Sequence, residues 1–486
     1  MALNGLLCWS ILMTNLKRFA QGVSWSAVAT LAKAGVQFVI FILLARYLSL
    51  GELGLVAFVT LLVSISQLLS DAGISNALIY FDKLDKQVKC QLYVLGLLLV
   101  AVMAALILFL LPVIEAFFNI SNLADYHLWI GSLLLLRGAA AQPTAILQKR
   151  LAFKQLATIE VFASVASLLT LVYLLQQGAT IEAALSAQLT NAMLIALCTS
   201  WYGKDELGFA LPRVKKLRGP LRYGIYQSAE GVVSFLSRQF DQLVVAKVMG
   251  AEVLGIYSYI KELVAKPALQ FINPIVNRVT FPSLVKLNVQ QKGNLYIKLM
   301  MALGCINIPL YIGIACFAEP TLVLAFGKSW LEHNQLVSVM AIAMLSTALI
   351  NPCGPLLQAS GAVRRSFVWN LALSLLRAVI ILAMVSRGLY ELALALAILQ
   401  GAVLAVHWFI LVTPFTNKGI FEFIKSLLPG LMITTFALLI SLLIQHYFFV
   451  SDFFALVIYA LATSAGLVLL ITLLKSKSTT SLTRQQ

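Results

Sequence analysis

Ionisable and amide side chains recur inside the apolar stretches of this 486-residue chain. In the stretch 253–281 they repeat at steps of four or three, which places them on one face of a helix. They are Ser258, Glu262, Lys266, Gln270, Asn273 and Asn277. Lysine and arginine on such a face can bind an anion, a carboxylate can take up a proton, and amides can bind hydroxyl groups.

Three further apolar stretches carry the same kind of polar face. The residues are Ser26, Thr30, Lys33 and Gln37; then Thr60, Ser64, Gln67, Asp71 and Ser75; then Glu230, Ser234, Arg238 and Asp241. A charge at mid-bilayer costs about 2.5 to 3.5 kcal/mol, so such residues usually face water or a partner. Four polar faces predict a shared aqueous cavity. The alternative is that ion pairs lock the helices together, and Glu262 with Lys266 or Arg238 with Asp241 could pair within one helix.

The composition requires that these faces belong to membrane helices. The chain is 61% hydrophobic and 11% charged with a mean hydropathy of +0.93, far more apolar than soluble domains. Apolar runs of about 20 residues, enough to cross a bilayer, recur along its whole length. We predict an all-α polytopic membrane protein with about fourteen spans, at 22–45, 53–80, 90–113, 127–148, 156–176, 181–203, 223–246, 253–281, 295–318, 333–357, 366–385, 391–413, 423–445 and 452–474.

Lysine and arginine outside these spans or at their ends predict the topology. Twenty-four of the 35 lie on one side and four lie on the other, which predicts that both termini are cytoplasmic. Topology thus accounts for most of the net charge of +16, and a nucleic-acid partner is not indicated. Apart from Glu182, Lys298, Glu391, Lys425 and Asp452 at the span ends, the charged residues inside the spans are Lys33, Arg137, Arg238, Lys261, Lys266, Arg278, Arg377, Asp71, Glu160, Glu230, Asp241 and Glu262. Of these, Arg278 and Glu160 lie near cytoplasmic ends and are expected to extend toward the interface.

An internal repeat divides the chain. The motif ARYLSLGELGLVAF at 45–58 matches AKVMGAEVLGIYSY at 246–259, with Gly54 on Gly255. Each copy has an even number of spans, which predicts two six-helix lobes related by a pseudo-two-fold axis along the membrane normal. The predicted segments are 1–21 (N-terminal, either interfacial or preceding a native start at Met13), 22–203 (N-lobe), 204–222 (basic linker), 223–413 (C-lobe), 414–474 (two extra helices) and 475–486 (cytoplasmic tail).

The motifs ARYLSLGELGLVAF, DAGISNALI and FPSL, with the second copy YGIYQSAEGVVSFLSRQFDQLVVAKVMGAEVLGIYSY, resemble the polysaccharide-transporter branch of the multidrug/oligosaccharidyl-lipid/polysaccharide flippase superfamily. That resemblance implies two lobes in a V around a central cavity. The implied cargo is an oligosaccharide linked to undecaprenyl diphosphate, moved by alternating access from the cytoplasmic to the periplasmic leaflet of a bacterial inner membrane. Its implied use is O-antigen, capsule or exopolysaccharide assembly, with a glycan polymerase, other assembly proteins and membrane lipids as partners and no cofactor.

If the cargo is of this kind, the polar residues inside the spans have expected roles in binding it. Lys33, Arg137, Lys266 and Arg377 lie near half-way across the membrane and are the predicted diphosphate ligands. Further cavity cations are Arg238 and Lys261, the proton-coupling candidates are Asp71, Glu230, Asp241 and Glu262, and the sugar-binding candidates are Gln37, Gln67, Gln270, Asn273 and Asn277. In addition, Pro267 and Pro274 are expected to kink the eighth span.

Other chemistry is weakly indicated. The six cysteines show no paired spacing and the four histidines are scattered, so neither a redox motif nor a metal site is predicted. The outer loops near 114–126 and 319–332 are too short for a catalytic domain, so we expect no enzyme activity. A multidrug or organic-cation antiporter of the same superfamily is the main alternative function, and a membrane glycan polymerase or ligase is a weaker one.

Overall fold

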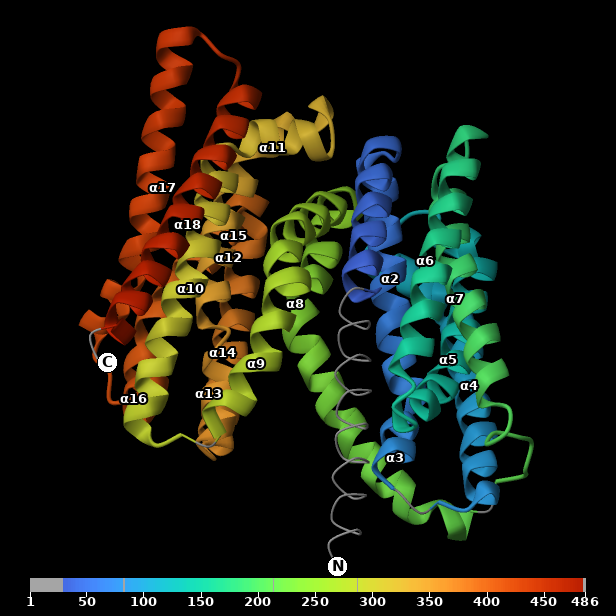
Figure 1. Ribbon diagram of the computed structural model, residues 1–486. Helices are drawn as coiled ribbons and strands as arrows, with labels where there is room; N and C mark the ends of the chain where they lie inside the picture. Colours follow the sequence, from blue (N-terminus) through green and yellow to red (C-terminus); the bar gives the residue numbers. More distant parts are fainter. Residues whose placement is uncertain (1–28, 82–83, 213, 286, 484–486) are drawn as a thin grey trace, which may run out of the picture. The chain divides into compact units, whose positions relative to one another are not determined.

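The protein is all-helical. The computed structural model describes residues 29–81, 84–212, 214–285 and 287–483, and every regular element within these ranges is a helix (Figure 1). This confirms the predicted fold class. The expectations for residues 1–21, including the choice between Met1 and Met13, lie outside the described residues, as does Ser26.

The described chain forms two compact units, Met1–Ile256 and Tyr257–Gln486. The first contains the span Ala29–Tyr47 and the following helices. They are α2 (Leu50–Asp71), α3 (Ile74–Tyr80), α4 (Lys86–Phe118), the 3-10 turn η1 (Ala124–Tyr126), α5 (His127–Lys149), α6 (Phe153–Gln176), α7 (Ile181–Gly203) and most of α8 (Val214–Lys266).

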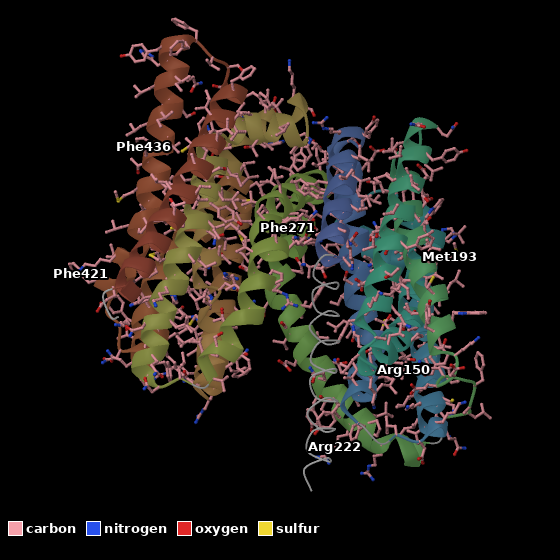
Figure 2. The ribbon with its side chains drawn as sticks, viewed as in Figure 1. Arg150, Met193, Arg222, Phe271, Phe421 and Phe436 are labelled. Atoms are coloured by element: carbon pink, nitrogen blue, oxygen red, sulfur yellow. The ribbon has the colours of Figure 1, made fainter. Side chains whose placement is uncertain are left out.

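The second unit continues from the end of α8. Its elements are η2 (Pro267–Ile272), α9 (Asn273–Val285), α10 (Val289–Cys316), α11 (Ala318–Ala325), η3 (Lys328–His333), α12 (Asn334–Ile350), α13 (Cys353–Ala359), α14 (Val363–Met384), η4 (Val385–Arg387), α15 (Leu389–His407), η5 (Trp408–Val412), α16 (Thr413–Thr416), α17 (Ile420–Phe448) and α18 (Asp452–Thr483). The exposed side chains of Phe421 and Phe436 on α17 can be followed in Figure 2, and such a surface suits lipid.

Thirteen helices within the described residues are long and apolar enough to cross a membrane. The longest of them, Leu217–Ile272, has 56 residues and would be about 80 Å long if it were straight, far more than a bilayer requires. It contains Gly250, whose φ of 86° and ψ of −178° are not helical. The predicted boundary between the seventh and eighth spans lies at this residue. The number fourteen, the pseudo-two-fold axis and the lobe boundaries stay predictions.

Several predicted spans are interrupted for identifiable reasons. The second span is not continuous, because Ala72 (φ 46°) and Gly73 (φ 67°) are left-handed and separate α2 from α3. A Cβ on Gly73 would lie 2.2 Å from the carbonyl oxygen of Gly224 on α8, so only glycine fits there. In the eighth span Pro267, which has no N–H to donate, begins the π-helical segment η2. The kink predicted from Pro267 and Pro274 stays a prediction.

Local capping fixes the start of α2 and joins it to α7. The hydroxyl of Ser49 and the carboxylate of Glu52 form a capping box with each other's backbone N–H groups. The hydroxyl of Thr180 also donates a 2.5 Å hydrogen bond to Glu52 Oε1, and α7 begins at the next residue. These hydrogen bonds fix the N-terminal end of α2, which carries the polar face, next to the start of α7.

Candidate functional site

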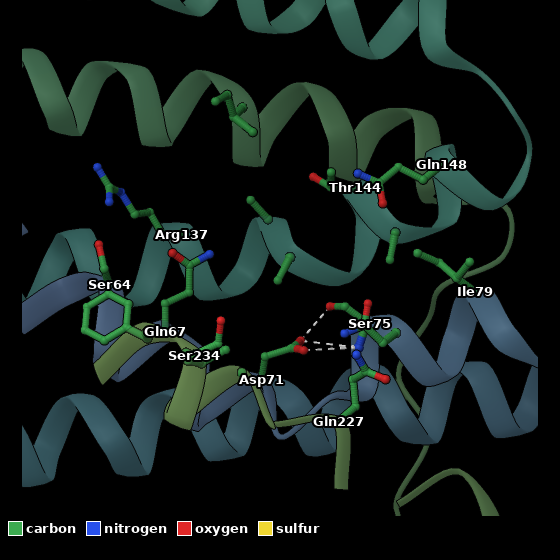
Figure 3. A pocket seen from close by; sticks show the side chains of 18 of the residues that line it. Ser64, Gln67, Asp71, Ser75, Ile79, Arg137, Thr144, Gln148, Gln227 and Ser234 are labelled. Carbon is green, nitrogen blue, oxygen red and sulfur yellow. Dashed lines mark hydrogen bonds between the residues drawn. The ribbon is translucent and has the colours of Figure 1, made fainter. Parts of the chain in front are cut away.

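A polar pocket lies inside the first unit. Its volume is ≈ 760 Å³, and its walls come from α2, α3, α5, α7 and α8 (Figure 3). The charged and amide side chains at its walls are Gln67, Asp71, Asn76, Arg137, Gln148, Asn191, Gln227, Glu230 and Arg238. The predicted polar faces of the second and seventh spans thus meet at one pocket, together with Arg137 of the fourth.

Helical spacing places these groups. On α2, Ser64, Gln67 and Asp71 follow at steps of three and four and so share one face. On α5, Arg137 is followed on the same face by Ala141, whose methyl group leaves room for a pocket. Figure 3 shows the side chains of Gln67 and Arg137 among those that line the pocket.

Asp71 is positioned by the break between α2 and α3. Its Oδ1 accepts a 2.5 Å hydrogen bond from the hydroxyl of Ser75, and the backbone N–H of Ser75 lies 3.3 and 3.4 Å from the two carboxylate oxygens. The carboxylate therefore caps the first turn of α3 while it remains at the pocket wall (Figure 3). No lysine or arginine among the described residues forms an ion pair with Asp71.

The two arginines of the pocket each form a hydrogen bond with a neutral side chain. Nη2 of Arg137 lies 3.4 Å from Oε1 of Gln188 on α7, and no carboxylate in the described ranges pairs with this half-buried guanidinium. Nη1 of Arg238 donates a 2.6 Å hydrogen bond to the hydroxyl of Ser234, one turn earlier on α8. Glu230 lies one further turn away and is exposed. The predicted pairing of Arg238 with Asp241 stays a prediction.

Two predicted residues of the first span do not line this pocket. Lys33 Nζ forms an ion pair of 3.0 Å with Glu160 Oε2 on α6, with 29% and 33% of the two side chains exposed. Glu160 thus does not simply extend toward the interface as the sequence suggests, because it faces a lysine on the neighbouring helix. Gln37 is exposed. Lys33 therefore forms an ion pair between helices, which is the alternative that the sequence left open. Arg137, in contrast, lines a pocket, as the cavity prediction requires.

The remaining predicted cations belong to the second unit or its boundary helix. Lys266 is buried and its Nζ lies 2.8 Å from Glu262 Oε2, so the predicted pair within the helix is confirmed. The Nζ of Lys261 lies 5.6 Å from the centre of the Tyr257 ring. Nη2 of Arg377 donates a 2.6 Å hydrogen bond to Gln400 Oε1 on α15.

The predicted amides of this unit lie along η2 and α9. The buried oxygens of Gln270 and Asn273 have no hydrogen-bond partner among the described residues, whereas Asn277 Oδ1 accepts a 3.0 Å bond from Asn351. Buried amide oxygens without a protein partner are rare, and a water molecule or a bound polar group can satisfy them. Whether these groups share one cavity with the pocket of the first unit stays a prediction.

Sequence reasoning missed the contribution of α5 and α7. On α5, Thr144 and Gln148 follow Ala141 on the face that carries Arg137, and Asn191 of α7 lies at the same pocket. The spacing of seven and eleven residues from Arg137 was a readable signal of a fifth polar face. No group of three or more metal-binding side chains occurs in the residues that the structure describes.

A separate charged cluster joins α4, α5 and the segment after α7. The carboxylate of Glu206 accepts hydrogen bonds from Lys89 and from Nε of Arg150, and Nη1 of Arg150 donates a 3.1 Å bond to the carbonyl of Tyr202. Burial raises the pKa of Glu206, but the hydrogen bonds from Lys89 and Arg150 outweigh it and leave the pKa below its ordinary value. This cluster holds helix ends together and does not line the pocket.

Comparison with known proteins places the chain in a family. Residues 43–335 match the family described as "Polysaccharide biosynthesis protein". The teichuronic acid biosynthesis protein TuaB of Bacillus subtilis (strain 168) is 27% identical over 397 residues, which cover 81% of this chain and 79% of TuaB. The lipopolysaccharide biosynthesis protein WzxC of Escherichia coli (strain K12) is 26% identical over 419 residues, covering 84% of this chain and 83% of WzxC.

A solved structure shares the fold. The lipid II flippase MurJ in an inward closed conformation superposes with a TM-score of 0.72, covering 92% of this chain and 99% of MurJ at 14% identity. An identity this low establishes a common fold and no more. These similarities confirm the resemblance that the sequence motifs indicate. Because the family match spans more than half of its residues, this chain belongs to the polysaccharide biosynthesis protein family.

Proposed function

We propose that this protein is a flippase for lipid-linked oligosaccharides. The cargo is an oligosaccharide repeat unit on undecaprenyl diphosphate, which alternating access moves from the cytoplasmic to the periplasmic leaflet of a bacterial inner membrane. Both termini are cytoplasmic in this proposal. Exported units then reach a glycan polymerase and other assembly proteins that build O-antigen, capsule or exopolysaccharide.

The observation that carries the proposal is the pocket of the first unit. Two arginines, Arg137 and Arg238, line its wall together with amides and hydroxyls. A guanidinium binds phosphate oxygens through two parallel hydrogen bonds, and amides suit sugar hydroxyls. The family membership agrees with this chemistry.

Two carboxylates give the pocket a means of coupling to protons. With Asp71 and Glu230 ionised, they balance the formal charge of the two arginines. Each proton taken up leaves the pocket one charge more positive, which strengthens its attraction for a diphosphate. Each proton released weakens that attraction and favours release of the headgroup.

The same carboxylates favour one alternative function. An organic-cation antiporter needs acidic groups at its pocket, and Asp71 and Glu230 are there. We favour the lipid-linked cargo because two arginines repel an organic cation at the same wall. A polymerase or ligase finds less support, since the outer segment predicted at 319–332 holds only part of α11 and the short η3.

A deletion strain complemented with variants tests the proposal. Arg137→Gln and Arg238→Gln should abolish surface glycan, while single lipid-linked repeat units accumulate in the cytoplasmic leaflet, out of reach of a glycosidase added to spheroplasts. Arg387→Gln is the matched control, because this arginine ends η4 and does not line the pocket. Each variant must be present in the membrane at the wild-type amount.

The other functions give different results. If the repeat units accumulate where the added glycosidase cleaves them, the protein acts after export, as a polymerase does. If glycan is normal in the deletion strain but sensitivity to cationic drugs rises, the protein is a multidrug antiporter. Either result overturns the flippase proposal.

A further inference from the structure

A second cavity, with a volume of ≈ 520 Å³, lies on the second unit, between the first half of α14 and the π-helical segment η5. Its lining has two arginines, Arg364 and Arg365, and an otherwise apolar wall. The proposed transport mechanism does not use these residues. We propose that this groove binds an anionic membrane phospholipid, with its phosphate at the arginines and an acyl chain along the apolar wall.

The charges at the mouth of the groove call for an anion. Arg364 and Arg365 lie in the first turn of α14, which contains no acidic residue. Positive side chains at a helix N-terminus oppose the helix dipole, and the free backbone N–H groups there also attract negative charge. Both arginines are exposed, and neither pairs with a carboxylate within the described part of the chain. A phosphate at this position would relieve the repulsion.

Contacts at Arg365 and at the turn before Arg364 shape the mouth of the groove. The guanidinium carbon of Arg365 lies 5.5 Å from the centre of the Phe415 ring on α16, a cation–π distance that orients its planar face. The turn before Arg364 is fixed by Lys292, whose Nζ donates to the carbonyl of Ala359 at 3.1 Å and to the hydroxyl of Ser360 at 3.3 Å. The guanidinium of Arg365 and the backbone before Arg364 therefore have defined neighbours at the mouth of the groove.

The apolar wall continues from the arginines in the direction of the membrane core. Along α14, Val368 and Ala372 follow Arg365 at steps of three and four and lie on the same face. Ala372 lies about 10 Å further along the helix axis than Arg365. Opposite them, η5 contributes Ile410 and Leu411.

A groove with arginines at one end and an apolar wall beyond them matches one class of ligand. The charge pattern of the sequence predicts that the arginine end of α14 lies at the cytoplasmic surface, where anionic lipid headgroups are found. A phospholipid has its phosphate at that level and its acyl chains below. A free phosphate would use only the arginines and would leave the apolar wall uncovered.

Lipid titration of the purified full chain tests the site. Phosphatidylglycerol is added in detergent and bound lipid is counted by native mass spectrometry, with phosphatidylcholine and inorganic phosphate as separate probes. Each basic residue contributes about 1 kcal/mol to the binding of an anionic lipid. The double variant Arg364→Gln, Arg365→Gln should therefore bind phosphatidylglycerol about thirtyfold more weakly than the wild type. Ala372→Phe, which fills the apolar part of the groove, should also weaken it. Arg387→Gln, at the other end of the same helix segment, should not.

Each other outcome overturns the proposal. If phosphatidylglycerol binds the double variant as tightly as the wild type, the arginines are not its ligands. If Ala372→Phe has no effect and inorganic phosphate competes fully, the site takes a bare anion. If phosphatidylcholine binds equally well, the groove is an ordinary lipid-facing surface. Size-exclusion profiles matching the wild type establish that the variants fold, and Arg365→Lys, which keeps the charge, should recover part of the binding.

Discussion

The two repeat motifs meet through their glycines, and this contact gives a sharp prediction. A Cβ on Gly54 would lie 1.7 Å from the carbonyl oxygen of Ala251, and a Cβ on Gly255 would lie 2.3 Å from the carbonyl oxygen of Leu50. Gly54 matches Gly255 in the repeat, and Leu50 matches Ala251 at the same offset. The close approach is therefore reciprocal between equivalent positions.

Gly54→Ala should destabilise the protein, whereas Gly51→Ala should not. Since ordinary contacts begin near 3.4 Å, the backbones around Gly54 must separate by about 1.7 Å to admit a methyl group. Overpacking of this kind costs about 1 to 3 kcal/mol of folding free energy. We expect a cost at the upper end of this range, because the methyl group would meet backbone atoms, which move less easily than a side chain. Alanine regains about 1 kcal/mol of helix propensity, so the expected net loss is about 2 kcal/mol. A Cβ on Gly51 meets nothing within 4 Å, so that variant should gain stability.

Thermal stability of the full-length protein in detergent measures these effects. The fraction that remains monodisperse after heating should rank Gly51→Ala above wild type and wild type above Gly54→Ala. Combining Gly54→Ala with Gly255→Ala should cost less than the sum of the single changes, because the first substitution already separates the backbones. Equal melting temperatures for Gly51→Ala and Gly54→Ala would refute the close approach of the motifs.

Two further predictions concern ion pairs away from the pocket. Because the pKa of Glu206 is lowered, its stabilising contribution is present above its ordinary value of 4.5 and is lost as the pH falls through the lowered pKa. Glu206→Gln should therefore flatten the acid side of the stability profile, measured as melting temperature against pH, and an unchanged profile would contradict the assignment. For Lys33 and Glu160, the exchange Lys33→Glu with Glu160→Lys should restore the membrane abundance and glycan export that either single change reduces. If the exchanged protein is as impaired as the single variants, loss of this ion pair is not the reason that the single changes are harmful.

The sequence predicted the membrane helices and the polar face of α2 because both depend on local periodicity. Steps of three and four place Gln67 and Asp71 on one side of a helix in any packing, and the structure finds both at the pocket. Arg137 could likewise be identified from the cost of a charge in an apolar span. These inferences need no knowledge of which helices are neighbours.

Local sequence patterns could not predict which helices are neighbours in the folded protein. The partner of Lys33 is Glu160, 127 residues later, and no spacing rule connects two residues so far apart. The break after Asp71 depends on the approach of Gly73 to Gly224, which is a property of packing between helices. A single polar residue such as Asn191 on an apolar helix is also indistinguishable from an ordinary interhelical hydrogen bond until its neighbours are known.

The balance of charge in the pocket yields a final test, which separates proton coupling from simple positioning. Asp71→Asn keeps an oxygen that can accept the hydrogen bond from Ser75, so the cap of α3 survives. Together with Glu230→Gln it fixes the pocket in the charge state that full protonation would produce.

The coupled mechanism then predicts opposite effects on binding and transport. Removing two negative charges should tighten binding of a soluble diphosphate headgroup analogue, about fivefold or more for 1 kcal/mol of Coulomb energy. Transport should nevertheless fail, because the pocket can no longer become neutral and release its cargo. Arg387→Gln, which does not line the pocket, is the control and should keep transport. If the double variant binds the analogue no more tightly than the wild type, the carboxylates do not set the affinity of the pocket for anions.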